Sequence, residues 1–343
     1  MMLPQDACGG CTPAPKKLSA DSVIMALEMR NASATQSMSR LGRRKRPKST
    51  GTGLAQPNSS QPPMSLVANS KTSGTTSGAK YIPITRESLP NHIGSARRAL
   101  FAYIARTGKA DFVDGKMIFL QGSPVLDRKG QVPMGRLSGI VANHVPAYLL
   151  KNRLPSFAVN SIPDWETKVD AVVEETRTHD LRLISGIPAW VRMYFERLLQ
   201  RTGKATVQEV FPHFSLFVYG GVNYEPYRRG MEALIGGAVD SVELFPASEG
   251  FIAYQDQGPG EGLLLGRDNG IYFEFIPVED LGKAEPRRLH IGQVEIGVNY
   301  ALVLHTNAGL WGYLIGDTVK FTSLLPPRVV VTGRTKHFTS AFG

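Results

Sequence analysis

The chain has 343 residues, a length that allows one large or two ordinary globular domains. Of these residues 42% are hydrophobic, and the formal net charge is +10. No segment reaches the roughly 18 uninterrupted apolar residues of a membrane helix, and the N-terminus has no secretory pattern, so we expect a soluble, cytoplasmic protein without a membrane partner. Residues 1–71 hold ten of the 39 Lys and Arg residues and three of the 29 Asp and Glu residues, and therefore carry +7 of the net charge. This concentration favours a basic tail over a nucleic-acid-binding fold, so no nucleic-acid partner is expected.

Residues 1–68 are rich in Ser, Pro, Gln, Asn and Gly and show little sustained apolar periodicity, so we expect a disordered tail. Its basic run, residues 43–48, could be a nuclear localisation signal or an arm that binds nucleic acid. We favour the other interpretation, a solvated basic tail. The two cysteines, Cys8 and Cys11, have no second pair to complete a zinc site and are expected to be free thiols.

Helix and strand signals alternate along residues 69–247, which predicts an α/β part with a mostly parallel sheet covered by helices. The first helix is expected to have Thr85 as its N-cap and Pro90 in its first turn, and a later one to open at Pro188 and end at Gly203. The expected helices span residues 86–106, 164–178, 188–200 and 226–235, and the expected strands span residues 116–120, 181–185, 214–218 and 241–245.

Residues 248–343 have few helix signals, which predicts a β-rich part. Its expected strands span residues 262–265, 271–276, 294–304, 319–321 and 329–332.

The strongest candidate site is the Ser, Thr and Gly run between residues 71 and 80, which is not a Walker A loop. Glycines allow close backbone approach, hydroxyls and amides can meet phosphate oxygens, and Lys80 adds a positive charge. Such a run is also typical of a linker, although an ordered element follows it at once. The expected phosphate-binding residues are Thr72, Ser73, Gly74, Thr75, Thr76, Ser77, Gly78 and Lys80.

Three later motifs are each weak alone. Ser248 and Glu249 follow a strand, where a carboxylate can hold Mg²⁺ against phosphates, or where a capped turn can form. Tyr313 and Asp317 flank a turn, where Tyr313 could pack against a nucleotide base and Asp317 could accept hydrogen bonds from ribose hydroxyls. The other interpretation is a tight β-turn without a binding role. Arg334 lies in Gly-Arg-Thr-Lys after a strand, where a simple charge cluster is the other interpretation.

The order of these four motifs resembles the acyl-acid amido synthetases, the auxin-responsive and jasmonate-amido synthetase group of the acyl-adenylate-forming superfamily, which includes firefly luciferase. The resemblance covers about residues 70–343. It implies the large N-terminal domain of the adenylate-forming fold. It also implies activation of a carboxylic acid by ATP and Mg²⁺ as an acyl-adenylate, which an amino acid then attacks to form an amide.

The resemblance also implies residue roles. Lys80 and Glu249 would be catalytic, with Glu249 the Mg²⁺ ligand, and Ser248 would approach the α-phosphate. Asp317 would bind the ribose. The remaining nucleotide contacts implied beyond the phosphate loop are Gly220, Gly221, Phe245, Tyr313 and Arg334.

Several features depart from the family pattern. Leu314 replaces an arginine, the N-terminal tail replaces folded sequence, and the sequence stops at Gly343. The C-terminal lid is therefore expected to be absent, and the activity to be weak or absent. Another adenylating enzyme, such as an acyl-CoA ligase, and a non-catalytic nucleotide-binding remnant remain alternatives. The acyl pocket is expected to draw on apolar residues such as Leu137, Val141, Val222 and Tyr224.

Overall fold

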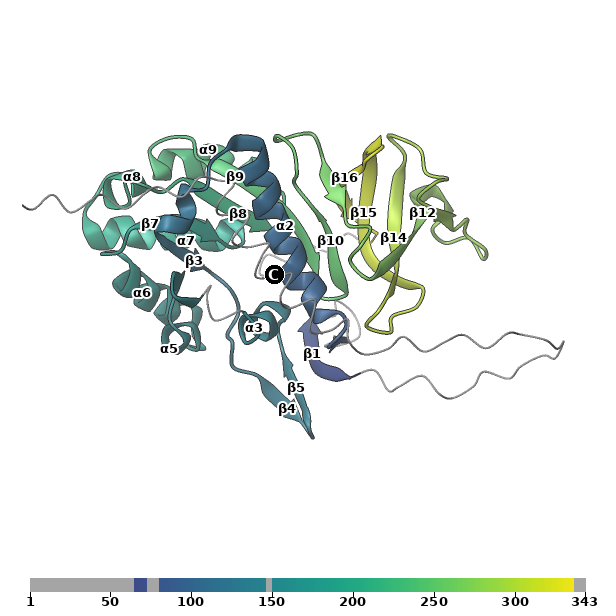
Figure 1. Ribbon diagram of the computed structural model, residues 1–343, viewed down its shortest axis with the longest axis horizontal. Helices are drawn as coiled ribbons and strands as arrows, with labels where there is room; N and C mark the ends of the chain where they lie inside the picture. The colour runs from purple at the N-terminus through teal and green to yellow at the C-terminus, as the bar shows by residue number, and fades with distance from the viewer. Residues whose placement is uncertain (1–64, 73–79, 146–149, 336–343) are drawn as a thin grey trace, which may run out of the picture. The chain divides into compact units, whose positions relative to one another are not determined.

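The computed structural model describes residues 65–72, 80–145 and 150–335, all within one compact unit that spans residues 55–343 (Figure 1). Its strands form a sheet of four strands in the order β2-β1-β5-β4. They also form a sheet of twelve in the order β13-β12-β14-β15-β16-β11-β10-β9-β8-β7-β3-β6. The expected α/β class, with a β-rich part, is confirmed.

One half of the large sheet is parallel. It consists of β6 (Arg153–Leu154), β3 (Lys116–Phe119), β7 (Leu181–Ser185), β8 (Leu216–Gly220) and β9 (Asp240–Ala247). Leu181, Ile184 and Phe217 are fully buried, as expected for strands covered on both faces.

Helices cover this parallel half, and each has recognisable end signals. The side chain of Asp164 accepts a hydrogen bond from the Thr167 amide and so caps α6. Pro188 opens α7, and Gly203 and Gly236 end α7 and α9 in the left-handed conformation. The main helices here are α6 (Trp165–Thr176), α7 (Pro188–Thr202) and α9 (Glu225–Ile235), with short helices α5 (Phe157–Asn160) and α8 (Val207–Val210).

Helix α2 (Leu89–Thr107) packs on β9 and β10, and it begins three residues later than expected (Figure 1). The Ser88 amide donates to the Thr85 hydroxyl at 3.2 Å, and the Thr85 amide donates to the Ser88 hydroxyl at 3.0 Å. These two bonds form a turn before the helix. Ser88 is therefore the N-cap residue, and Pro90 lies in the first turn.

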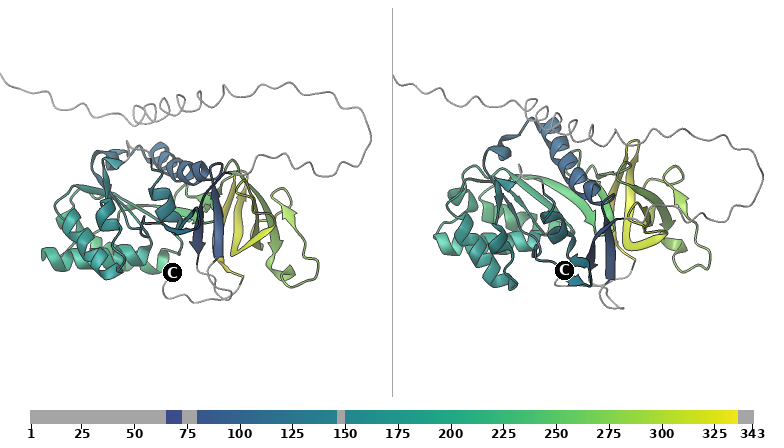
Figure 2. Two further views of the ribbon diagram at one scale, coloured as in Figure 1. Left: turned by 90° about the horizontal axis from the view of Figure 1, so that it is seen from below. Right: turned by 60° about the horizontal axis from the view of Figure 1, so that its bottom comes forward.

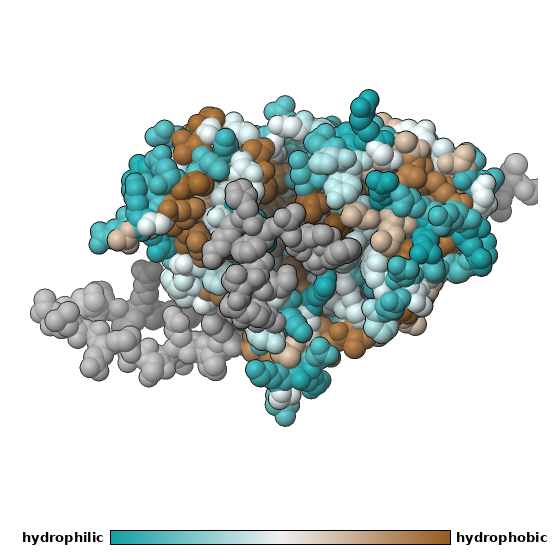
Figure 3. All heavy atoms as spheres, turned by 180° about the vertical axis from the view of Figure 1, so that it is seen from behind, coloured by the Kyte–Doolittle hydropathy of each residue, from teal (hydrophilic) through white to brown (hydrophobic). Residues whose placement is uncertain are grey.

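The other half of the large sheet is antiparallel and encloses a second core. Phe275 packs against Phe321 and Tyr300, with ring centroids 5.0 and 6.1 Å away. Its strands are β10 (Gly250–Tyr254), β11 (Leu263–Leu265), β12 (Ile271–Pro277), β13 (Leu289–His290), β14 (Asn299–Thr306), β15 (Tyr313–Leu324) and β16 (Pro327–Arg334). On the face shown in Figure 3, hydrophobic groups are separated by hydrophilic ones.

The small sheet was not expected. It contains β1 (Leu66–Thr72), β2 (Lys80–Thr85), β4 (Asp127–Lys129) and β5 (Val132–Gly135). Strands β1 and β2 lie side by side, as Figure 2 shows, and α3 (Leu137–Ala142) packs on β1. Strand β1 starts at Leu66, so it includes three residues that the sequence analysis placed in the tail. The division of the chain into parts otherwise stays a prediction.

Candidate functional site

The site is organised around the turn that joins β9 to β10. Gly250 pairs with Ala247, so Ser248 and Glu249 form the two-residue loop of a hairpin. The preceding part of β9 runs parallel to β8 as far as the pair Gly220–Leu244. Ser248 and Glu249 therefore lie just past the carboxyl edge of the parallel strands, where α/β sheets commonly bind ligands.

The two strands that flank the phosphate-loop motif lie next to this turn. Thr72 ends β1, Lys80 begins β2, and the two residues pair across the ladder. The Ser70 and Ser248 hydroxyl oxygens are 2.8 Å apart and share a hydrogen bond. Six expected phosphate-binding residues lie outside the described residues: Ser73, Gly74, Thr75, Thr76, Ser77 and Gly78.

The third and fourth motifs meet on neighbouring strands. Asp317 of β15 pairs with Arg334 of β16, and the Arg334 Nε donates to Asp317 Oδ1 at 2.9 Å. Gly316 has a φ of +95°, a conformation that favours glycine, and its carbonyl accepts a hydrogen bond from the Thr335 amide at 2.8 Å. The end of β16 is thereby fixed against the Tyr-Leu-Ile-Gly-Asp segment.

Electrostatics connect three of the four motifs at Glu249, and Arg334 of the fourth motif is bonded to Asp317. Burial raises the pKa of the Glu249 carboxyl, and the nearby Asp317 carboxylate raises it further. Lys80 and a hydrogen bond from the Tyr313 hydroxyl act in the opposite direction. Burial and Glu249 together raise the pKa of Tyr313. The fold thus brings Lys80, Glu249, Tyr313 and Asp317 within interaction range, although they are far apart in the sequence.

The residues expected near the adenine have different environments. Gly220 is required by close packing, because a Cβ there would lie 2.5 Å from the Leu244 carbonyl oxygen. Gly221 has a φ of +83°. The Phe245 side chain is buried in the core of the β-rich part, with 7% of its surface exposed. The expected acyl-pocket residues are also spread out, since Tyr224 belongs to the core of the parallel half, whereas Leu137 and Val141 pack beside Ile140.

The donor set fits magnesium bound together with a nucleotide. Within the described ranges, no group of three or more His, Cys, Asp or Glu side chains could hold a metal ion. Mg²⁺ in nucleotide sites usually takes one or two protein carboxylates and completes its shell with phosphate oxygens and water. Glu249, destabilised as an anion by burial and by Asp317, offers such a carboxylate.

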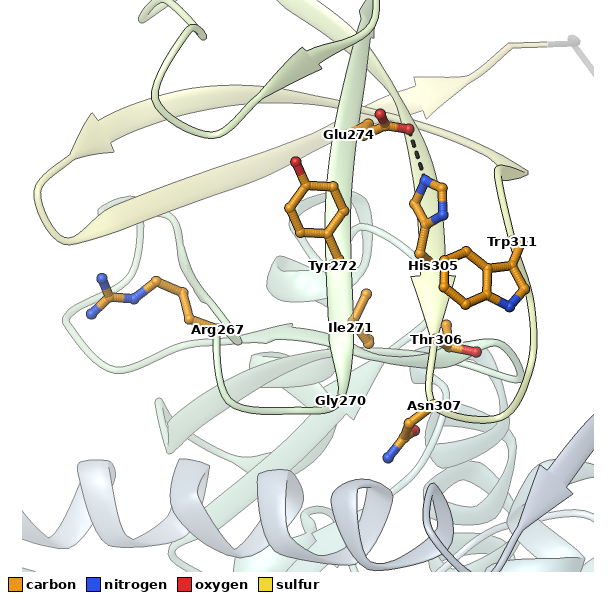
Figure 4. Close-up of a pocket in the computed structure, with 9 residues that line it drawn as sticks. All are labelled: Arg267, Gly270, Ile271, Tyr272, Glu274, His305, Thr306, Asn307 and Trp311. Atoms are coloured by element: carbon orange, nitrogen blue, oxygen red, sulfur yellow. Dashed lines mark hydrogen bonds and ion pairs between the residues drawn. The ribbon is translucent and has the colours of Figure 1, made fainter. Parts of the chain in front are cut away.

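A separate hollow of about 570 Å³ lies on β12 and β14 (Figure 4). The Tyr272 and Trp311 rings lie on either side of His305, with centroids 5.7 and 5.6 Å from its ring. Both ring nitrogens of His305 have partners, since Nε2 is 2.8 Å from Glu274 and Nδ1 accepts from the Gly312 amide at 3.3 Å. None of the residues given a nucleotide-binding role lines this hollow.

Ser70 is the site residue that sequence reasoning missed. It lies in Asn-Ser-Lys-Thr, at the edge of the tail, and no spacing in the sequence distinguishes it from a linker serine. Its contact joins residues 178 positions apart, so only the folded chain shows it.

In the part of the chain that the structure describes, no helix has the length and apolar character that crossing a bilayer requires.

Comparison with known proteins supports the resemblance. Residues 264–334 match the GH3 family central domain. Over 120 residues the chain is 32% identical to a jasmonoyl-L-amino acid synthetase of Nicotiana attenuata, covering 33% of this chain and 21% of that protein. Over 54 residues it is 41% identical to an indole-3-acetic acid-amido synthetase of Oryza sativa subsp. indica, covering 15% of this chain and 9% of that protein.

Solved structures show the same fold. The AtGH3.15 acyl acid amido synthetase, solved in complex with 2,4-DB, superposes with a TM-score of 0.60 at 15% identity, over 78% of this chain and 56% of that one. A 2-hydroxyisobutyryl-CoA ligase gives a TM-score of 0.53 at 15% identity, over 80% and 58%. The chain therefore has part of the adenylate-forming fold and spans little more than half of these structures.

Proposed function

Since the chain resembles the acyl-acid amido synthetases in sequence and in fold, we propose that it binds ATP and Mg²⁺ and adenylates a carboxylic acid, which is then joined to an amino acid as an amide. The observation that carries this proposal is that residues of three separated motifs meet at Glu249, while Arg334 of the fourth motif bonds Asp317. Lys80, Tyr313 and Asp317 all interact with its carboxyl, and Ser70 bonds the neighbouring Ser248.

Each motif has a role that suits its chemistry. Lys80 and the loop before it would face the phosphates, Ser248 would donate to the α-phosphate, and Glu249 would hold Mg²⁺. Asp317 would accept hydrogen bonds from the ribose hydroxyls. The other nucleotide contacts in the proposal are Gly220, Gly221, Phe245, Tyr313 and Arg334.

The main physical difficulty of the reaction is the approach of two anions, the carboxylate and ATP. Positive charge on Lys80, aided by Mg²⁺ when it is bound, would offset this repulsion and stabilise the charge that develops at phosphorus. Arg334 donates a hydrogen bond to Asp317, so its positive charge would offset part of the repulsion between Asp317 and the nucleotide. No nucleophilic side chain is needed, because the substrate carboxylate is itself the attacking group.

ATP–pyrophosphate exchange with a panel of carboxylic acids tests the proposal. We expect at most weak, acid-dependent exchange, which Glu249→Ala abolishes and which Glu285→Ala, a change at an exposed glutamate, leaves intact. Product analysis with amino acids and with coenzyme A then identifies the acceptor. Amide products support the proposal, thioesters favour an acyl-CoA ligase, and ATP binding without exchange favours a non-catalytic nucleotide-binding protein.

A further inference from the structure

We infer that Ser70 is a positioning residue that directs the Ser248 hydroxyl toward the nucleotide, an inference that rests on the proposed function. Ser70 is fully buried, and its backbone is held on both sides. It pairs with Ile82 of β2 and with Gly135 of β5, two residues before β1 ends and the phosphate loop begins. Its hydroxyl therefore starts from a fixed point at the base of that loop.

The hydrogen bond between the two serines has a preferred direction. Either oxygen can supply the proton of a serine–serine bond. Among the described residues, Ser248 Oγ is the single hydrogen-bond partner of Ser70 Oγ. If Ser248 were the donor, the buried Ser70 proton would have no acceptor among the described residues, which would cost free energy. We therefore assign Ser70 as the donor of this bond and Ser248 as its acceptor.

This direction determines what Ser248 can do. Because its oxygen accepts from Ser70, its own proton is free to donate to another oxygen, and the bond to Ser70 limits where that proton points. A phosphate oxygen beside Glu249 is the acceptor that the proposed function supplies. Ser70 thus acts on the nucleotide only through Ser248.

A double-mutant cycle tests this dependence. We would measure the dissociation constant of ATP with Mg²⁺ by calorimetry for the full chain, for Ser70→Ala, for Ser248→Ala and for the double variant. Each single change should weaken binding roughly ten- to hundredfold, the loss typical of a hydrogen bond to a charged group. The double variant should bind no more weakly than Ser248→Ala, because Ser70 has no separate effect.

A control separates positioning from general damage to the fold. Ser95 is also a fully buried serine, and its hydroxyl has no hydrogen-bond partner among the described residues. Ser95→Ala should leave the dissociation constant unchanged. If the effects of Ser70→Ala and Ser248→Ala add in the double variant, the inference is wrong while the proposed function stands. If the unmodified chain does not bind ATP with Mg²⁺, the proposed function itself fails, and the inference fails with it.

Discussion

Gly220 of β8 pairs with Leu244 of the parallel strand β9, and replacing Gly220 with alanine should destabilise the protein. The added Cβ would lie 2.5 Å from the Leu244 carbonyl oxygen, whereas ordinary contacts begin at 3.4 Å, so the strands must separate by 3.4 − 2.5 = 0.9 Å. The obstacle is backbone and cannot rotate away. Overpacking of this kind costs about 1–3 kcal/mol, and we expect the upper part of that range.

Urea unfolding followed by circular dichroism measures this cost, and Gly94→Ala is the matched control. Gly94 lies inside α2, and a Cβ there would meet nothing within 4 Å. The control should therefore stabilise the protein by about 0.5–1 kcal/mol, because alanine loses less backbone entropy in a helix. A Gly220→Ala variant with the unfolding free energy of the unmodified chain would refute the argument from close packing.

Three further predictions follow from buried groups. The raised pKa of Glu249 means that the folded state holds its proton more tightly than the unfolded chain. In the absence of nucleotide, the unfolding free energy should therefore fall as the pH rises from 4.5 through the raised pKa. Glu249→Gln should lack that fall in unfolding free energy. Burial lowers the pKa of Lys168 from 10.5 to about 8, so the folded chain releases this proton at a lower pH than the unfolded chain. The unfolding free energy of the unmodified chain, relative to that of Lys168→Met, should therefore rise between pH 8 and pH 10.5. A difference between the two proteins that does not change with pH would contradict this. Phe275→Ala should cost about 3–5 kcal/mol by urea unfolding, since Phe275 is fully buried; a cost below about 1 kcal/mol would show that the core collapses around the gap.

The sequence was most informative where local signals agree with burial. The strand 181–185 was predicted with its observed bounds, because Leu181, Leu183 and Ile184 make a short apolar run between two clear helix signals. Gly203 ends its helix as expected, since glycine adopts the left-handed conformation without strain. The confirmed fold class follows from such elements in alternation.

Other elements were poorly predicted for identifiable reasons. Strand β14 starts at Asn299 rather than 294, because Gly297, with a φ of +83°, turns the chain first. Strand β15 has twelve residues, but only 319–321 were expected, since Gly316 and Asp317 interrupt the apolar pattern. Strand β1 was not expected because Leu66–Thr72 is mostly polar and gains stability from pairing with β2 and β5.

The site could be predicted only as a set of residue types. Motif order indicated which residues to compare, and the structure shows that Lys80, Glu249, Tyr313 and Asp317 interact. Which of them touch each other depends on strand pairings between distant segments, which periodicity does not encode. The Ser70–Ser248 contact is of this kind. The assigned roles in nucleotide binding stay predictions until ligand binding is measured.

Strand β9 takes part in both halves of the large sheet. It is bonded to β8 in parallel along one edge and to β10 in the antiparallel sense along the other. Strand β8 pairs with Asp240–Leu244 and strand β10 with Leu244–Ala247, so the two ladders meet at Leu244. A displacement of β9 would therefore move the parallel ladder and the turn at Ser248 and Glu249 together.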